Sequence, residues 1–332
     1  MSTVAVLGAG SWGTTLADLL AAKGHAIRLW AYEPEVVDSV NQAHENAMFL
    51  PGVRLADGVR AFADAREATD GATVVVSAPP SHAARAVLGS VRQAVAPGTL
   101  VVSATKGIEA ETLALMSQVL AECLPQARAA VLSGPSFAAE VCQGQPTAVV
   151  AAAADSSAAQ DTQQLFATPA FRVYSGSDVI GVELGGALKN VIAIAAGILE
   201  GLGLGHNPRA ALITRGLAEI TRLGVAMGAD PLTFAGLAGM GDLVLTTTGA
   251  LSRNRALGVA IARGETLEHY RSVHRSVAEG ANTSRAGAAL GRRMNVELPI
   301  TQKVCDVLFS GKPAREAVPE LMGRELKSEQ WR

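Results

Sequence analysis

The sequence predicts an α/β protein with a doubly wound parallel sheet in its first half and a helical second half. Short Val-rich runs alternate with helical stretches up to about residue 175, and strand patterns stop after about residue 178. A glycine-rich loop directly follows the first of the Val-rich runs. Repeated βα units of this kind are typical of a parallel sheet with helices on both faces.

The expected strands are short and apolar at successive positions, as is typical of strands buried on both faces. They are Val4–Leu7, Ala26–Trp30, Thr73–Ser77, Thr99–Ser103, Ala129–Leu132, Thr147–Ala151 and Phe171–Tyr174. Helical spacing occurs between them, for example over Thr14–Lys23 and His82–Val95. Gly24 stands where a glycine commonly ends a helix, directly after the first of these stretches.

The second half shows helical patterns only. The expected helices are Val179–Gly201, Pro208–Gly228, Leu257–Arg263, Arg285–Asn295 and Lys303–Ser310. The short polar segment Ser175-Gly176-Ser177 is the best boundary. We therefore expect a first domain with the sheet over residues 1–177 and a helical second domain over residues 178–332. Because the connection is short, the two domains should pack tightly.

Length and composition favour a protein of two ordered domains. The chain has 332 residues, of which 49% are hydrophobic and 17% charged, so a large core can form. The formal net charge is −2 and the isoelectric point about 6.3. Neither half has a strong basic excess, so we expect no nucleic-acid partner and no electrostatic binding to membranes.

Cysteine and histidine spacing predicts no metal site. The three cysteines lie far apart without a CxxC pair, and the six histidines show neither HxxxH nor HExxH spacing.

The N-terminus has no basic segment before Lys23, so we expect no secretory signal. The longest apolar run, Val191 to Leu199, has nine residues, whereas a membrane span needs about 20. A cytoplasmic protein is the expectation.

The loop Gly8-x-Gly10-x-x-Gly13 lies between the first strand and the first helix. Gly8 permits a tight turn, Gly10 lets a pyrophosphate approach the backbone, and Gly13 allows close packing of helix on strand. The free N–H groups at the start of that helix favour an anion. The strand before and the helix after make dinucleotide binding the better interpretation than a purely structural turn.

An acid stands near the position that selects between NAD and NADP. Glu33 follows the second expected strand, 20 residues after Gly13. Such an acid often holds a ribose 2′-hydroxyl and favours NAD. An ordinary exposed turn residue before Pro34 is an equal alternative.

Lys189 and Asn190 interrupt an otherwise apolar helix. A helix that is apolar all round is buried, and a buried ammonium is costly without a partner. Either the pair lines a polar cleft, or Lys189 reaches the surface with its long stem.

Other polar residues follow expected strands or begin helices. Lys106 comes after the strand Thr99–Ser103, at the sheet edge where doubly wound proteins bind ligands, although most loop lysines are only surface residues. Ser136 could cap a helix or belong to a plain turn, and Asp242 could be an ordinary N-cap. Ser252-Arg253-Asn254 is either a cap and helix start suited to a phosphate or a basic exposed turn.

Taken together, the motifs of this chain resemble those of the bacterial NAD(P)-dependent glycerol-3-phosphate dehydrogenase family. The matching segments cover nearly the whole chain in order. They are Gly8-Ala9-Gly10-Ser11-Trp12-Gly13-Thr14, Ala104-Thr105-Lys106-Gly107-Ile108-Glu109, Ser133-Gly134-Pro135-Ser136-Phe137-Ala138, Glu183-Leu184 with Lys189-Asn190, Gly239-Met240-Gly241-Asp242-Leu243, Ser252-Arg253-Asn254 and Glu279-Gly280. One departure is Tyr32-Glu33, where many relatives carry His or Arg beside an acid, and it leaves the choice between NAD and NADP open.

The resemblance implies an N-terminal Rossmann-like domain and a helical C-terminal domain like that of 6-phosphogluconate dehydrogenase. It implies reduction of dihydroxyacetone phosphate by NADH or NADPH to sn-glycerol 3-phosphate, which supplies glycerophospholipid synthesis. Substrate and cofactor would meet between the domains. A homodimer is the assembly we expect.

The resemblance also implies roles for individual residues. Lys189 would protonate the reduced carbonyl oxygen, a role that a lysine pKa lowered by burial would suit, with Asn190 and Asp242 beside it. The implied substrate contacts are Lys106, Gly134, Ser136, Lys189, Asp242, Thr248, Ser252, Arg253 and Asn254. The implied cofactor contacts are Gly8, Gly10, Ser11, Trp12, Gly13, Tyr32, Glu33, Lys106, Ala138, Arg253, Val277 and Glu279.

Two alternatives remain at this point. One is a related dehydrogenase of β-hydroxy acids or of 6-phosphogluconate, which shares the two-domain plan. The other is a dinucleotide sensor that has lost turnover. The Ser252-Arg253-Asn254 segment argues against the first, and the presence of both Lys189 and Asp242 argues against the second.

Overall fold

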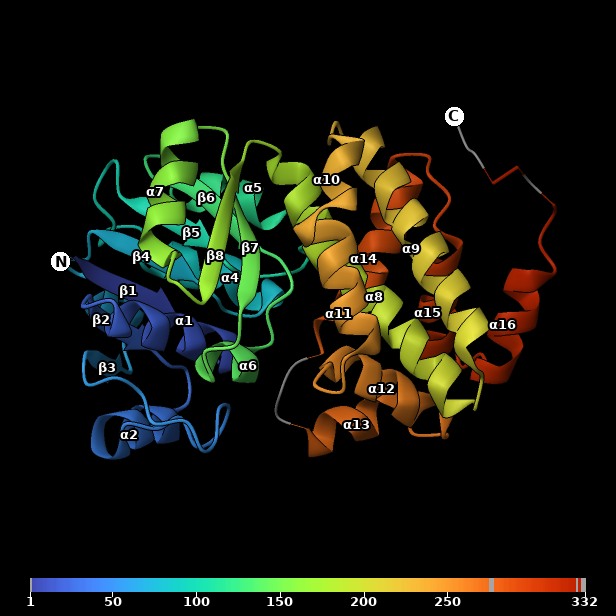
Figure 1. Ribbon diagram of the computed structural model, residues 1–332, viewed down its shortest axis with the longest axis horizontal. Coiled ribbons are helices and arrows are strands. Elements are labelled where there is room, and N and C mark those ends of the chain that lie inside the picture. The colour runs from blue at the N-terminus through green and yellow to red at the C-terminus, as the bar shows by residue number, and fades with distance from the viewer. Residues whose placement is uncertain (1, 275–277, 327, 330–332) are drawn as a thin grey trace.

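The computed structural model describes residues 2–274, 278–326 and 328–329. A sheet with its helices forms the first part of the chain, and a bundle of helices forms the second (Figure 1). The fold class expected from the sequence is confirmed. The sheet part ends with strand β8 at Gly176, and the helical part begins with helix α8 at Val179.

Within the described residues, eight strands form one sheet in the order β3-β2-β1-β4-β5-β6-β7-β8. Every neighbouring pair is parallel except β6 and β7, which run antiparallel. The strands are β1 Thr3–Leu7, β2 Ala26–Trp30, β3 Val59–Phe62, β4 Val74–Ser77, β5 Leu100–Ser103, β6 Arg128–Ser133, β7 Thr147–Ala152 and β8 Phe171–Gly176.

Two strand predictions need correction. The sequence pattern missed β3, a four-residue edge strand in which Arg60 interrupts the apolar run. An edge strand is covered less completely, so its sequence carries a weaker apolar pattern. The prediction of a uniformly parallel sheet was also wrong at one place, where Val131 of β6 pairs with Ala152 of β7 in an antiparallel ladder.

Helices cover both faces of the sheet. They are α1 Ser11–Ala22, α2 Pro34–Ala43, α3 Ala65–Thr69, α4 Ser81–Ser90, α5 Met116–Cys123, α6 Ala138–Cys142 and α7 Ser156–Phe166. Gly24 has a φ of 90° directly after the C-cap of α1, as its expected role at a helix end requires.

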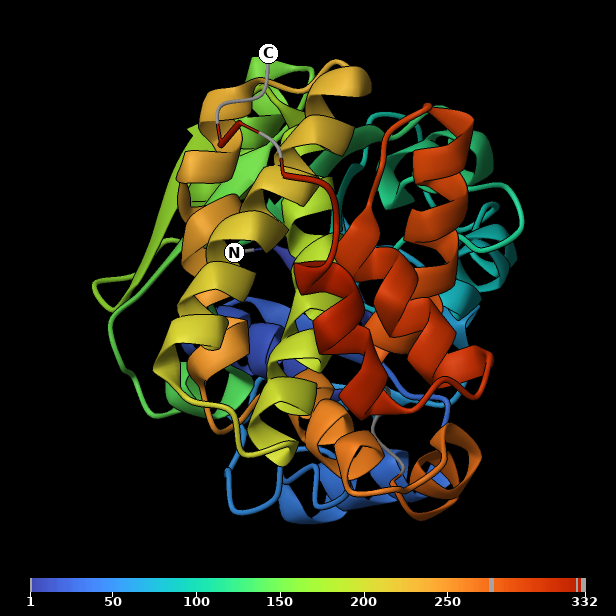
Figure 2. The same cartoon turned by 90° about the vertical axis from the view of Figure 1, so that its right-hand side faces the viewer.

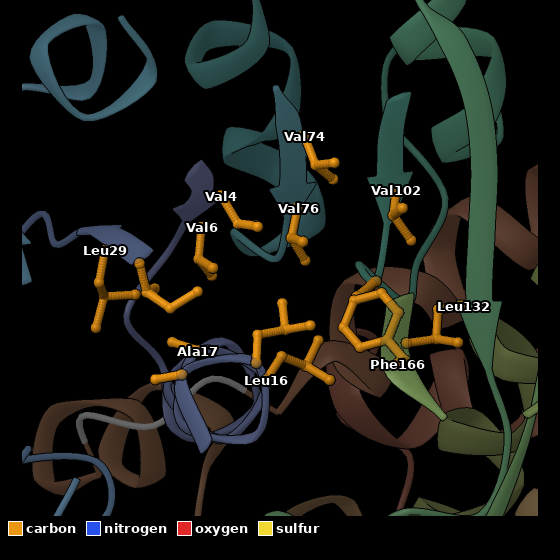
Figure 3. Packing of buried hydrophobic residues seen from close by; sticks show 14 of the residues in the cluster. Val4, Val6, Leu16, Ala17, Leu29, Val74, Val76, Val102, Leu132 and Phe166 are labelled. Carbon is orange, nitrogen blue, oxygen red and sulfur yellow. The ribbon is translucent and has the colours of Figure 1, made fainter. Parts of the chain in front are cut away.

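Alternation along the strands explains why both faces are buried. On one face, Val4 and Val6 of β1 point toward Leu16 of α1, with Phe166 of α7 nearby (Figure 3). On the other face, the intervening residues, such as Ala5, pack in a second cluster with α4 and α5. The loops at the carboxyl ends of the strands remain available to bind ligands.

The second part consists of helices in the described residues. They are α8 Val179–Gly201, α9 His206–Ala226, α10 Pro231–Ala235, a π-helical turn η1 Leu237–Gly241, α11 Asp242–Thr248, α12 Arg253–Ala262, α13 Leu267–Val273, α14 Glu279–Arg293, α15 Pro299–Phe309 and α16 Ala314–Met322. The predicted bounds of α8 agree with the structure. The sequence pattern missed α10, α11, α13 and α16, which are short or weakly patterned.

Helix α8 is the core of the second part. It contacts α9, α11, α12 and α14, and Figure 2 shows it between α9 and the C-terminal helices. Its 23 residues are long and apolar enough to cross a membrane by length and composition alone. However, 83% of its most apolar window is buried within the protein. The helix is therefore buried as a core helix is, and its apolar side chains pack against other helices.

Candidate functional site

The cofactor loop has the geometry that its glycines predict. Gly8 has a φ of 111°, which a residue with a Cβ rarely adopts. A Cβ on Gly13 would overlap the carbonyl oxygen of Gly8, so α1 can begin this close to β1 only with glycine there. Open space surrounds Gly10, and no side chain caps the start of α1. The free N–H groups of this turn can therefore hold a pyrophosphate.

Three of the other expected cofactor contacts lie around this loop or at the end of β2. Ala138 begins α6, and its carbonyl oxygen lies 3.5 Å from the hydroxyl of Thr15 on α1. Tyr32 is 82% exposed, and Glu33 is the N-cap residue of α2 through its backbone only. The carboxylate of Glu33 is thus not engaged in capping. Val277 lies outside the described residues.

Lys189 lies in a buried polar site between helices. It is 7% exposed, and its Nζ donates to Asp242 Oδ1 at 2.5 Å and to Thr246 Oγ1 at 2.7 Å. The alternative in which Lys189 reaches the surface is therefore wrong. Sequence reasoning did not identify Thr246, although it lies one helical turn after Asp242 and so shares its face of α11.

Asp242 joins the two parts of the chain. Its Oδ2 accepts a hydrogen bond from Lys106 Nζ at 2.6 Å, while its Oδ1 accepts from Lys189. Asp242 is 1% exposed, and Gly241 is the N-cap of α11, so the interpretation of Asp242 as a helix cap is wrong. One carboxylate therefore holds two ammonium groups, one from each part of the chain.

Burial lowers the pKa of Lys189 to about 7. Desolvation is the largest cause, and the positive charge of Lys106 acts in the same direction. The Asp242 carboxylate opposes both by stabilising the ammonium. A lysine with such a pKa can give and take a proton near neutral pH.

Lys106 lies at the carboxyl end of β5 and reaches across to the next strand. Its Nζ also donates to the carbonyl oxygen of Gly134 at 3.0 Å, so it is more than a surface lysine. Gly134 has a φ of 145° at the end of β6. The hydroxyl of Ser136 donates to the same carbonyl at 3.0 Å. Ser136 is not a helix cap, because Phe137 is the N-cap residue of α6.

A chain of amide groups connects α8 to two neighbouring helices. Asn254 Nδ2 donates to Asn190 Oδ1 at 2.9 Å, and Asn254 Oδ1 accepts from the backbone N–H of Gly280 at 2.9 Å. Ser252 is the N-cap residue of α12, and its Oγ accepts from Arg255 N, as one sequence interpretation expected. These bonds fix Asn190 beside Lys189.

Arg253 is exposed at the start of α12, where it faces the cofactor loop. Its Nη2 lies 3.4 Å from Ser11 Oγ, so the guanidinium spans the gap between the two parts of the chain. Thr248 is exposed and its hydroxyl donates to Val244 O within α11. The structure thus places Arg253 next to the cofactor loop, while the Thr248 hydroxyl is used within its own helix.

Glu279 makes a second contact across the gap. Its carboxylate accepts from Ser81 N at 3.0 Å and from Ser81 Oγ at 2.6 Å, at the start of α4. Sequence reasoning did not single out Ser81, which comes four residues after the end of β4 and begins α4. Among the described residues, no group of three or more His, Cys, Asp or Glu side chains could hold a metal ion.

Comparison with known proteins gives a consistent result over the whole length. Residues 3–159 and 178–319 match the family models described as the N-terminus and C-terminus of NAD-dependent glycerol-3-phosphate dehydrogenase. The chain is 56% identical over 331 residues to the glycerol-3-phosphate dehydrogenase [NAD(P)+] of Geobacter sulfurreducens, covering 99% of each chain. The relative of the same name from Geobacter metallireducens is 57% identical, with 98% of each chain covered.

A solved structure agrees with the sequence comparison. The crystal structure of glycerol-3-phosphate dehydrogenase from Coxiella burnetii has a TM-score of 0.94 and 39% sequence identity, and the match covers 97% of this chain and 99% of that one.

Proposed function

This chain belongs to the NAD-dependent glycerol-3-phosphate dehydrogenase family, and we propose that Lys189 is its proton donor. The enzyme reduces dihydroxyacetone phosphate with NADH or NADPH to sn-glycerol 3-phosphate, a precursor of glycerophospholipids. The two alternatives considered from the sequence, a related dehydrogenase and an inactive sensor, are therefore set aside.

The observation that supports this role is the shared carboxylate of Asp242. It holds Lys189 Nζ at 2.5 Å and Lys106 Nζ at 2.6 Å, so two positive charges converge between the cofactor loop side and the helical side. A carbonyl oxygen placed among these groups would be polarised as negative charge develops on it. Asn190 lies beside Lys189 and is held by Asn254.

The nicotinamide cofactor supplies the hydride when it is bound. The alkoxide left on C2 then takes a proton from Lys189, and Asp242 and Thr246 keep Nζ oriented toward it. In the reverse direction the neutral amine of Lys189 accepts the proton from the alcohol. The positive charge of Lys106 would stabilise the negative charge that develops on the oxygen.

The remaining site residues support binding. Arg253 would clamp the substrate phosphate, because its guanidinium lies at a helix start close to the cofactor loop and makes only a long hydrogen bond to Ser11 there. Gly134 and Ser136 would line the substrate site on the side of the sheet. Ser252 and Asn254 would line it on the side of the helical part. Thr248 would join the phosphate site only by turning its hydroxyl away from Val244.

The cofactor would lie along the start of α1, on Gly8, Gly10 and Gly13, with Ser11 and Trp12 beside it. Lys106 and Arg253 would face its nicotinamide end, while Ala138 and Glu279 would line its path. Tyr32 and Glu33 would meet the adenosine ribose. We also propose a division into domains at residues 177 and 178, a cytoplasmic location and a homodimer.

The experiment that tests the role of Lys189 is the Lys189→Met variant. Methionine keeps much of the stem volume, so the fold should survive. We expect kcat to fall by about 10²–10⁴-fold, since that is the usual contribution of a positioned general acid. NADH titration and thermal melting on the same preparation should differ little from the wild type, because the cofactor loop lies in the other part of the chain.

Lys312→Met is the matched control. Lys312 pairs with Glu320 on the surface of the helical part, far in the sequence from every site residue, and its loss should leave kcat unchanged. A folded Lys189→Met enzyme that keeps more than about a tenth of wild-type kcat, with chemistry rate-limiting, would rule out Lys189 as the acid.

A further inference from the structure

Among the described residues, three glutamates hold the start of a helix that is distant in sequence. Glu279 accepts from Ser81 at the start of α4, and Glu219 of α9 accepts from Ile300 N and Thr301 N at the start of α15. Glu183 of α8 accepts from Ser117 at the start of α5. Glu183 and Glu279 cross between the two parts of the chain, whereas Glu219 acts within the helical part.

Glu183 makes two hydrogen bonds to the start of α5 from the other part of the chain. Its Oε1 accepts from Ser117 N at 2.8 Å, and its Oε2 accepts from Ser117 Oγ at 2.5 Å. Ser117 is the second residue of α5, so its N–H has no partner within that helix. The carboxylate also meets the positive end of the α5 dipole.

Glu183 is a costly residue to bury, which argues that the contact is specific. It is 8% exposed, and burial raises its pKa to about 7 while the two hydrogen bonds from Ser117 oppose that shift. The mechanism proposed above makes no use of Glu183. The family motif nevertheless includes it, six residues before Lys189 on the same helix.

Glu183 ties α8 to the sheet part beside a pocket that is partly open to solvent. This pocket of about 530 Å³ is lined by Ser117, Val131 of β6 and Val179 of α8, so it lies at the junction of the two parts. Further along α8, a Cβ on Gly186 would lie 2.5 Å from Ser133 Oγ, which shows how closely the helix approaches the end of β6. Figure 1 shows α5 next to the helical part.

We propose that Glu183 is a positioning residue, whose attachment to the start of α5 sets where α8 presents Lys189 to the substrate. This inference rests on the proposed function of Lys189. Six residues of helix separate the two side chains by about 9 Å along the axis. A displacement of about 1 Å at the reacting groups can cost about 10²-fold in rate, so a small movement of α8 would suffice.

The test compares Glu183→Ala, Glu183→Gln and the matched control Glu219→Ala. Alanine removes the cap, whereas a glutamine can accept from Ser117 N and donate to Ser117 Oγ. Glu219→Ala removes a similar buried cap, from a residue 1% exposed, without touching the junction. Steady-state kinetics, NADH fluorescence titration and thermal melting are measured for each, with Lys189→Met in parallel.

We expect Glu183→Ala to lower kcat about tenfold or more, with the Kd for NADH within about twofold of the wild type. Glu183→Gln should restore most of kcat. Glu219→Ala should lower the melting temperature but leave kcat within about twofold. If Glu183 contributes to stability alone, Glu183→Ala should have the kcat of the wild type when both are assayed well below their melting temperatures.

Three results would overturn the proposal. They are unchanged kcat in folded Glu183→Ala, an equal loss of kcat in Glu219→Ala, and a Lys189→Met enzyme that still turns over. The last would overturn the proposed function as well, whereas the first, with Lys189→Met inactive, would overturn only the role of Glu183. If Glu183→Ala does not fold, Ser117→Ala decides, since it removes one bond only: lowered kcat with unchanged NADH binding supports the proposal, and unchanged kcat refutes it.

Discussion

The pH dependence of reduction should follow the protonation of Lys189. With a pKa of about 7, the ammonium form falls to about half at pH 7, about a tenth at pH 8 and about a hundredth at pH 9. Because the ammonium is the acid, kcat/KM for dihydroxyacetone phosphate should drop about tenfold for each pH unit above 7. In the oxidation of sn-glycerol 3-phosphate the neutral amine is required, so kcat/KM should rise through the same pH range.

The Asp242→Asn variant makes this prediction specific to Lys189. The Asp242 carboxylate raises the pKa of Lys189, against desolvation and the charge of Lys106. Its neutralisation should therefore lower that pKa further and move the falling limb of the reductive profile to lower pH. The second ionisation of the substrate phosphate, near pH 6, belongs to the substrate and should stay in place in both enzymes.

The assay is the initial rate of NADH oxidation at 340 nm, at substrate concentrations well below KM, from pH 6 to pH 9. Kinetics under these conditions report the ionisations of the free enzyme and free substrate. A flat profile above pH 7 would refute the assignment of the acid to a lysine with a lowered pKa. If the fall of kcat/KM above pH 7 occurs at the same pH in Asp242→Asn, the ionisation that causes it belongs to a group other than Lys189.

Three further outcomes are expected. Arg253→Ala should weaken the stabilisation of the transition state with dihydroxyacetone phosphate by about 2–5 kcal/mol, which lowers kcat/KM roughly 30-fold to several thousand-fold. The same variant should affect kcat/KM for dihydroxyacetone far less, and equal losses would mean that Arg253 does not bind the phosphate. NADH should be used at least as well as NADPH, because Glu33 has a free carboxylate at the end of β2, and a kcat/KM strongly favouring NADPH would contradict this role. Gly13→Ala should abolish NADH binding in a fluorescence titration, because its Cβ would overlap Gly8 O; binding at wild-type affinity would show that the loop can relax.

Patterns local in the sequence predicted most of the sheet and the longest helix. Strands that are buried on both faces are apolar at nearly every position, so Val74–Ser77 and Leu100–Ser103 can be recognised from the sequence. The edge strand Val59–Phe62 was missed because partial exposure allows Arg60 within it. The antiparallel pairing of β6 with β7 depends on where the chain turns in space, which local composition does not encode.

The candidate site divides in a similar way. Gly8, Gly10 and Gly13 could be interpreted from the sequence because their roles depend on backbone geometry within six residues. Lys189 was recognisable as an anomaly, since an ammonium within an apolar helix needs a partner.

Only the tertiary structure identified the partner of Lys189. Asp242 lies 53 residues from Lys189 and 136 from Lys106, and its sequence context is equally suitable for a helix cap. Likewise, the attachment of Glu183 to Ser117 joins residues 66 positions apart. Side-chain chemistry determines what a charged group can bind, but burial and the meeting of distant elements determine which group it binds and what its pKa becomes.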